Sequence, residues 1–429
     1  MPTIRRLTAL EILDSRGRPT VQATCELSDG TVGTASVPSG ASTGTAEALE
    51  LRDGDPRRYG GLGCRKAVAH IHQELHQALS GRPFETQQEL DQAMVALDGT
   101  PNKARLGANA LLAVSLAFAR ATAHHRGVPL YEQFATILAQ TDGGQAPASF
   151  RLPRPTINLF SGGKHAGGQV PIQDVLVVPA RARTMDEALS TTYAVYQAAA
   201  DLCRRKYQMR ALTADEGGLA PPFPHAQAML EDAVAAIRAA GFVPGQEVAL
   251  AIDVASTHFF QDGRYHLGEE PHDSLAQIQV VRQWVEAYPI VSVEDALAED
   301  DWEHWPELRR QLGERVLTLG DDLLCTNPAR IQRAIELGAA NALLLKVNQI
   351  GTLSEAAQAF VLARRAGWQV TVSARSGETE DNWLADLAVG WGGDQIKVGS
   401  ITQSERLAKY NRLLAIEVAA GFPLVAWPG

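Results

Sequence analysis

Charged side chains follow six predicted strands in the second half of the chain, at the point where each strand ends. Each strand is a short apolar run of aliphatic residues. The charged residues are, in chain order, Asp253, Glu294, Asp321, Lys346, Arg375 and Lys397. Their successive spacings of 41, 27, 25, 29 and 22 residues are close to one strand-plus-helix unit each, apart from the first. We therefore expect the six side chains to surround one cavity.

The residue types in this set predict a particular chemistry. Three carboxylates that meet in one cavity need a counter-charge, and a hard divalent cation such as Mg²⁺ supplies it. The set also has two lysines at strand ends. A neighbouring cation can lower the pKa of such a lysine, and a general base needs a lowered pKa. Arg375 and the adjacent Ser376 can both donate to a phosphate or carboxylate. Together these groups predict abstraction of a proton next to a carboxylate, with Mg²⁺ stabilising the enolate.

The second half of such a reaction needs an acid. Glu216, in the segment TADEGG at 213–218, follows another apolar-to-polar transition and is placed by its order in the chain to protonate a leaving group. His165 lies in a glycine-rich loop after a strand-like run at 155–159, which alone is a weak signal. His72 and His76 have helical spacing but no carboxylate partner, so they indicate a solvated helix face more than a metal site.

The elements that must position these residues are strands alternating with amphipathic helices beyond residue 155. Helical periodicity predicts helices over 185–207, 225–240, 275–287, 329–337, 353–366 and 403–420. Alternating strands and helices are typical of a parallel sheet, and this many units favour a closed α/β barrel over an open sheet.

The preceding residues show a different pattern, with strands over 3–13, 21–27 and 31–37 followed by helices over 64–79, 86–97 and 108–126. We expect an N-terminal α+β capping domain over 1–140, a linker over 141–155 and a catalytic barrel over 156–429. The segment PSGASTG at 38–44 holds only small and turn-forming residues. It is a candidate lid loop, taken as 38–45, although an ordinary surface loop has the same composition.

Composition excludes several other classes of protein. The formal net charge of -10 disfavours non-specific binding to nucleic acid or to an anionic membrane. The N-terminus lacks the long apolar stretch of a signal peptide, and no apolar run approaches the length of a membrane span. The four cysteines are scattered without CxxC spacing, which argues against a disulfide framework or a zinc site. A cytoplasmic enzyme fits these features best.

Nine segments resemble enolase (phosphopyruvate hydratase), and they extend over nearly the whole chain. They are DSRGRPTV (14–21), PSGASTG (38–44), EALELRDGD (47–55), DEGG (215–218), SVED (292–295), GDDL (320–323), LLLKVNQIG (343–351), RSGETED (375–381) and IKVGS (396–400). The resemblance implies a small α+β lid domain and a TIM-like barrel of the form ββαα(βα)6. It also implies homodimers or multiples of dimers, two Mg²⁺ ions per site and a phosphorylated three-carbon acid as substrate.

The resemblance also implies roles for individual residues. Lys346 is similar to the family's base and Glu216 to its acid partner. The implied metal ligands are Asp253, Glu294 and Asp321 for the tighter Mg²⁺ and Ser42 for the second. The implied substrate-binding residues are His165, Asp174, Arg375, Ser376 and Lys397.

Two positions depart from the family pattern, and both belong to the part of the site near the hydroxyl group that leaves. Ala374 stands where the family has histidine, and Asp174 stands where it has glutamate. The metal, base and phosphate positions are retained, and a selective change of this kind indicates an altered substrate. The chain resembles the carboxyphosphonoenolpyruvate synthases of phosphinothricin-type antibiotic pathways. Ordinary enolase activity and a non-catalytic scaffold are the two alternatives.

Overall fold

The first three strands form an antiparallel sheet that one long helix covers. The computed structural model describes residues 1–41, 43–208, 210 and 212–428. The sheet has the order β1 (Ile4–Leu13), β2 (Pro19–Leu27), β3 (Val32–Ser36), and α4 (Ala108–Arg126) packs on β2 and β3. A side chain on Gly33 would lie 2.3 Å from the backbone oxygen of Ala117. The glycine therefore permits the close approach of helix and sheet.

The other elements of this unit are η1 (Tyr59–Gly61), α1 (Arg65–His70), the π-helical turn η2 (Ile71–Leu75), α2 (His76–Leu79), α3 (Gln87–Asp98) and α5 (Leu130–Gln140). Among them, the helical segment from α1 to α2 packs on β1, whereas α3 and α5 pack on α4. The backbone N–H groups of Ala9 and Leu7 donate to His72 Nε2 at 2.8 Å and to His76 Nδ1 at 3.2 Å. His72 in η2 and His76 in α2 thus accept hydrogen bonds from backbone N–H groups of the edge strand β1. The sequence indicated only a solvated helix face here, so these contacts were not expected.

Among the described residues, eight strands close into a barrel, as the sequence predicts. In chain order they are β4 (Arg154–Ser161), β5 (Asp174–Val178), β6 (Ala249–Asp253), β9 (Ile290–Glu294), β10 (Leu317–Gly320), β11 (Ala342–Leu345), β12 (Gln369–Ser373) and β13 (Gln395–Lys397). β5 runs antiparallel to both β4 and β6, and the remaining pairs are parallel. The barrel therefore opens with the ββαα arrangement that the resemblance implies.

Helices surround this barrel. They are α6 (Met185–Lys206), α7 (Ala226–Ala239), α8 (Ser274–Ala287), α9 (Trp305–Leu312), α10 (Pro328–Leu337), α11 (Val347–Ile350), α12 (Leu353–Arg365), α13 (Trp383–Trp391) and α14 (Ser404–Ala420). The short elements are η3 (Gly163–His165), η4 (Ser256–Phe259) and the hairpin of β7 (Phe260–Gln261) and β8 (Arg264–Tyr265). Residue bounds of the six predicted helices agree with the observed ones to within one residue at each end.

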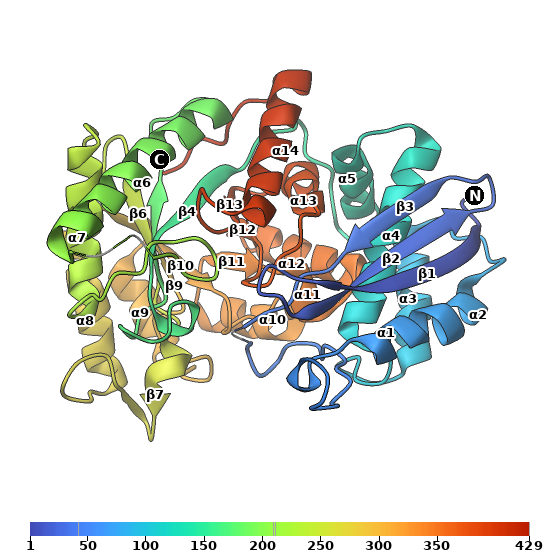
Figure 1. The fold of residues 1–429 in the computed structure, drawn as a ribbon, viewed down its shortest axis with the longest axis horizontal. Coiled ribbons are helices and arrows are strands. Elements are labelled where there is room, and N and C mark those ends of the chain that lie inside the picture. The colour runs from blue at the N-terminus through green and yellow to red at the C-terminus, as the bar shows by residue number, and fades with distance from the viewer. Residues whose placement is uncertain (42, 209, 211, 429) are drawn as a thin grey trace.

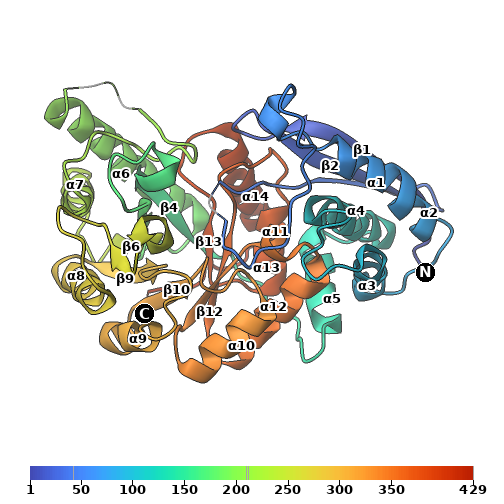
Figure 2. The ribbon, with the colours of Figure 1, turned by 90° about the horizontal axis from the view of Figure 1, so that it is seen from below.

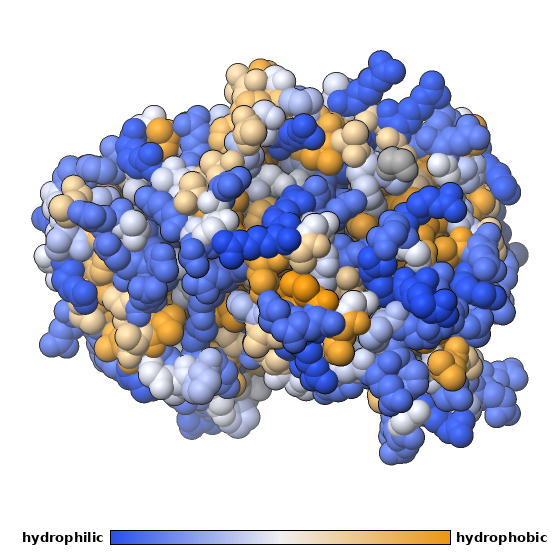
Figure 3. Space-filling model, turned by 180° about the vertical axis from the view of Figure 1, so that it is seen from behind, coloured by the Kyte–Doolittle hydropathy of each residue, from blue (hydrophilic) through white to orange (hydrophobic). Residues whose placement is uncertain are grey.

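Figures 1 and 2 show the two parts side by side, with the sheet of β1–β3 lying against the half of the barrel that carries α11–α14. Residues of α5 pack closely on α13, where a side chain on Gly390 would meet the backbone oxygen of Tyr131 at 2.2 Å. The face in Figure 3 is mainly hydrophilic, with its hydrophobic residues in small groups. No helix within the described part of the chain has the length and apolar character needed to cross a membrane.

Candidate active site

The six predicted charged residues lie at one edge of the barrel. Asp253, Glu294 and Lys397 are the last residues of β6, β9 and β13, while Asp321 and Lys346 directly follow β10 and β11. Arg375 lies two residues beyond the end of β12. These six strands are consecutive neighbours in the barrel, so their carboxyl ends form a continuous arc. All six side chains belong to buried residues.

Two buried lysines are paired with the three carboxylates. Lys397 Nζ lies 2.8 Å from Asp253 Oδ2 and 2.7 Å from Glu294 Oε2, and Lys346 Nζ contacts Asp321 Oδ2. Burial lowers the pKa of Lys346, but the nearby carboxylates, Asp321 first and then Glu294, together outweigh burial and raise that pKa. Burial and then the charge of Asp253 raise the pKa of Glu294 well above its ordinary value. In this arrangement both lysines serve as counter-ions to the carboxylates.

Two glutamines that sequence reasoning missed orient these carboxylates. Gln173 Nε2 donates to Asp253 Oδ2 at 3.0 Å, and Gln349 Nε2 donates to Asp321 Oδ1 at 2.8 Å. Gln349 lies within the family-like segment 343–351, and Gln173 precedes Asp174. The sequence signal that could have identified these two glutamines is therefore their position next to predicted site residues.

The acidic side chains of this arc fit a divalent metal. Glu294 Oε1 is buried and makes no hydrogen bond, which leaves a carboxylate oxygen for a ligand. Among the described residues, ligand atoms lie within 4.8 Å of one another in two groups, Asp295–Asp321–Asp322 and His165–Asp174–Glu216. The implied set of Asp253, Glu294 and Asp321 shares only Asp321 with these groups. Its members are nevertheless brought to adjacent strand ends, and carboxylate oxygens are the ligands that Mg²⁺ prefers.

The predicted oxyanion clamp lies beneath the loop at 38–45. Arg375 Nη1 donates to Glu47 Oε2 and to Asn348 Oδ1, both at 3.0 Å. Ser376 Oγ accepts a hydrogen bond from Arg16 Nη1 at 3.0 Å. Glu47 and Arg16 lie in family-like segments, but their contacts with the clamp could not be read from the sequence.

The backbone of the candidate lid loop contacts the segment that carries this clamp. Ser39 and Gly377 exchange two backbone hydrogen bonds of 2.8 and 3.0 Å. A side chain on Gly40 would lie 1.9 Å from a guanidinium nitrogen of Arg375, so a larger residue at position 40 would displace the end of the Arg375 side chain. Ala41 lines the cavity. Ser42, the implied ligand of a second metal, lies outside the described residues.

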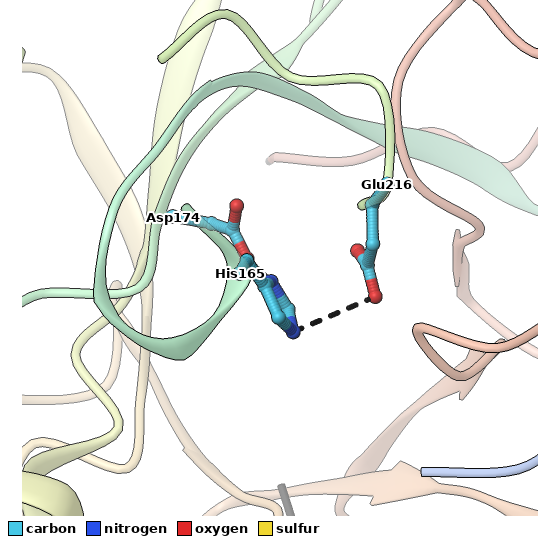
Figure 4. A group of neighbouring side chains, drawn as sticks. All are labelled: His165, Asp174 and Glu216. Carbon is cyan, nitrogen blue, oxygen red and sulfur yellow. Dashed lines mark hydrogen bonds and ion pairs between the residues drawn. The ribbon is translucent and has the colours of Figure 1, made fainter. Parts of the chain in front are cut away.

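Glu216 and His165 both line the cavity and face each other. Glu216 lies in the connection between α6 and α7 rather than at a barrel strand, and this connection is tied to β4 by the bond from Leu219 N to Leu159 O at 2.8 Å. His165 Nδ1 lies 2.9 Å from Asp174 Oδ2, and its Nε2 lies 3.8 Å from Glu216 Oε1 (Figure 4). Burial lowers the pKa of His165, but Glu216 and Asp174 more than offset burial and raise it to about 9.

A small cavity joins these groups. Its volume is about 20 Å³, and the lining residues are Ala41, His165, Gln173, Glu216, Asp253, Lys346, Ser373, Ala374, Arg375, Ser376 and Lys397. Ala374 therefore lies on the cavity wall next to the clamp, where its methyl group fills little of the space. The sequence-predicted base, acid, clamp and altered position are all brought to one cavity, while Asp174 contacts it only through His165.

The closed barrel begins with a ββαα arrangement and carries carboxylates and lysines at the ends of its strands. An α+β domain caps it. Together these features define a barrel enzyme of the enolase superfamily. The chain belongs to the enolase family. The family model of the enolase N-terminal domain matches residues 4–134, and that of the enolase C-terminal TIM barrel domain matches residues 149–423. This membership supports Mg²⁺-dependent lyase chemistry of the enolase type on a small phosphorylated acid.

Proposed function

We propose that the protein is a C–O lyase of the hydro-lyase type acting on a three-carbon phospho or phosphono acid. We further propose that it is specialised as a carboxyphosphonoenolpyruvate synthase-like enzyme of phosphonate or phosphinate antibiotic biosynthesis. The observation that carries the specialisation is Ala374 on the cavity wall, together with the shortened Asp174, in a site whose other groups are retained. Without an imidazole at position 374, the space beside the clamp can accept a group that ordinary enolase excludes.

In this proposal each side chain has a defined task. Mg²⁺, when bound by Asp253, Glu294 and Asp321, supplies positive charge that stabilises the enolate and offsets the carboxylates now paired with the lysines. Lys346 Nζ takes the proton from the carbon next to the substrate carboxylate, and Lys397 faces that carboxylate. Glu216 gives a proton to the leaving oxygen, so the C–O bond breaks, a C=C bond forms and water departs. The product is an enolpyruvate ester.

The remaining groups hold the substrate in place. Arg375 and Ser376 donate to its phosphate or phosphonate oxygens, and a substrate anion would replace Glu47 as a partner of the guanidinium. Ser42 would hold a second Mg²⁺, which would give two ions per site. His165 and Asp174 lie at the leaving-group end. The protein works in the cytoplasm as a homodimer or a multiple of dimers.

Two other functions compete with this proposal. An ordinary enolase would convert 2-phosphoglycerate to phosphoenolpyruvate and water with Asp174 in the role of the longer glutamate. A non-catalytic scaffold would bind no substrate at all, but the complete set of strand-end carboxylates and lysines argues against it, because buried charges are costly to keep without use.

Phosphorus NMR distinguishes these functions. The purified protein is incubated with Mg²⁺ and 2-phosphoglycerate, with and without a nucleotide-activated phosphonoformate, and the products are followed over time. The specialised function predicts a new phosphonate-containing enolpyruvate signal only when both compounds are present, with the phosphoryl group of 2-phosphoglycerate displaced onto the nucleotide that leaves the phosphonoformate. Rapid conversion of 2-phosphoglycerate alone to phosphoenolpyruvate would establish the ordinary enolase instead.

The double substitution Ala374→His with Asp174→Glu tests whether the two departures redirect the site. We expect it to raise the rate of plain 2-phosphoglycerate dehydration by roughly tenfold or more, because a positioned acid–base group contributes at least that much. The rate is measured as phosphoenolpyruvate absorbance under saturating Mg²⁺. Equal rates for the double variant and the wild type would show that these positions do not set the substrate.

A further inference from the structure

Both carboxylate oxygens of Asp174 are already occupied by protein groups. Ser161 Oγ donates to Oδ1 at 2.5 Å, and His165 Nδ1 lies 2.9 Å from Oδ2. Ser161 and Asp174 are direct cross-strand partners at the ends of β4 and β5, and neither is accessible to solvent. A side chain on Gly218 would lie 2.3 Å from Ser161 Oγ, so the chain packs tightly around this pair. Asp174 therefore turns both oxygens toward protein groups, and it is not among the residues that line the cavity.

His165 carries the other end of this chain of contacts into the cavity. Its Nδ1 is committed to Asp174, and its Nε2 points toward Glu216 Oε1, as Figure 4 shows. Asn158 Nδ2 donates to the second oxygen of Glu216 at 2.9 Å, which fixes the orientation of that carboxylate. His165 and Glu216 line the cavity, whereas Asp174 and Ser161 lie behind them. The separation of 3.8 Å between Nε2 and Oε1 leaves both groups able to reach one oxygen atom.

We propose that Ser161 and Asp174 are positioning residues that hold His165 as a cation with its Nε2–H directed at the leaving group. His165 rather than Asp174 then donates a hydrogen bond to the departing oxygen, beside Glu216. The shortened carboxylate thus acts through the imidazole instead of meeting the substrate itself. This inference rests on the proposed function for its catalytic meaning, but the protonated, aligned state of His165 is a property of the free protein.

The charges around His165 favour the cation. Asp174 on β5, Glu216 in the connection before α7 and Asp253 on β6 are the acidic groups that act on it. His258 also lies nearby, but burial and then Lys164 lower its pKa to about 4, so it adds no positive charge at neutral pH. The pKa of His165 is raised above that of an unfolded histidine. Its contribution to stability is therefore complete below about pH 6.5 and is lost as the pH rises through about 9.

Nitrogen-15 NMR of the imidazole groups tests the proposal on the free protein, without substrate. His165→Gln identifies the His165 signals by their loss. In the wild type we expect both ring nitrogens to remain protonated at pH 7.5 and to titrate near pH 9. Asp174→Asn is expected to lower that midpoint by at least one pH unit, and Ser161→Ala is expected to broaden the Nδ1–H signal because Asp174 loses its second anchor.

A second Ser–Asp–His arrangement in the chain provides the matched control. Ser274 Oγ donates to Asp301 Oδ2 at 2.6 Å, and Asp301 Oδ1 lies 2.6 Å from His304 Nδ1, outside the residues that line the cavity. Ser274→Ala should leave both the His165 titration and turnover unchanged. Ser161→Ala should lower kcat about tenfold with little change in KM.

Three results would overturn the proposal. A neutral His165 at pH 7.5 would remove the cation, and an unchanged titration in both Ser161→Ala and Asp174→Asn would remove the positioning role. Loss of the Nε2 proton on addition of Mg²⁺ or Zn²⁺ would show that His165, Asp174 and Glu216 form a metal site instead. If His165 titrates as expected but no substrate is converted, the positioning stands and the proposed function fails.

Discussion

Replacement of Lys346 by alanine is expected to lower turnover by about 10³-fold, because the side chain is the only proposed acceptor of the α-proton and a positioned base contributes 10²–10⁴-fold. The buried carboxylate of Asp321 also loses its cation, so the variant should be less stable in the absence of metal. Turnover is measured by product formation, and folding is checked by circular dichroism with and without Mg²⁺.

Lys206→Ala is the matched control for this substitution. Lys206 lies at the end of α6, half-exposed, and its Nζ is 2.6 Å from Asp232 Oδ1, so it also pairs with a buried carboxylate. Loss of this lysine should leave turnover within a factor of two of the wild type. Substantial activity in a folded Lys346→Ala protein would show that another group removes the proton.

The second large effect is expected from Glu294→Gln. The amide retains the size of the side chain but removes one negative charge from the proposed metal site, including the unpartnered Oε1. We expect the Mg²⁺ concentration for half-maximal activity to rise roughly 100-fold or more, since even indirect ligand contacts are worth 10–100-fold in metal affinity. In thermal unfolding, Mg²⁺ at about 100 times its Kd should stabilise the wild type by about 2.7 kcal/mol and the variant by far less.

Glu336→Gln removes one negative charge from the exposed face of α10 and serves as the control for net charge. Its Mg²⁺ dependence should match that of the wild type. If Glu294→Gln also retains the wild-type Mg²⁺ dependence, the divalent ion binds elsewhere, and the group of Asp295, Asp321 and Asp322 becomes the place to test next.

The barrel could be predicted from the sequence because charged residues mark the ends of buried strands at nearly regular intervals. Helices were predicted from their apolar periodicity. Elements with neither signal were missed. All nine residues of α13 are buried, so this helix has no polar face and its apolar residues show no helical periodicity. The helix α5 and the short hairpin of β7 and β8 were missed as well.

The individual contacts of the site depend on register, which a sequence pattern does not specify. Asp174 pairs with Ser161 on one side and with Asp253 on the other because β5 runs antiparallel between β4 and β6. That register allows the side chain of Ser161 to donate a hydrogen bond to Asp174 and that of Gln173 to donate one to Asp253. The sequence identified Asp174 as an altered residue, but only the three-dimensional structure shows that its oxygens are turned toward Ser161 and His165.

Deuterium exchange tests the central claim most directly. The wild-type protein is incubated in D₂O with saturating Mg²⁺ and either 2-phosphoglycerate or its phosphonate analogue, and the hydrogen next to the carboxylate is followed by proton NMR. The account predicts that this hydrogen exchanges with deuterium or that the acid loses water. It also predicts that EDTA abolishes these reactions and that Lys346→Ala slows them about 10³-fold. Complete retention of the hydrogen in both acids, by a folded protein saturated with Mg²⁺, would contradict enolase-type chemistry and leave the non-catalytic scaffold.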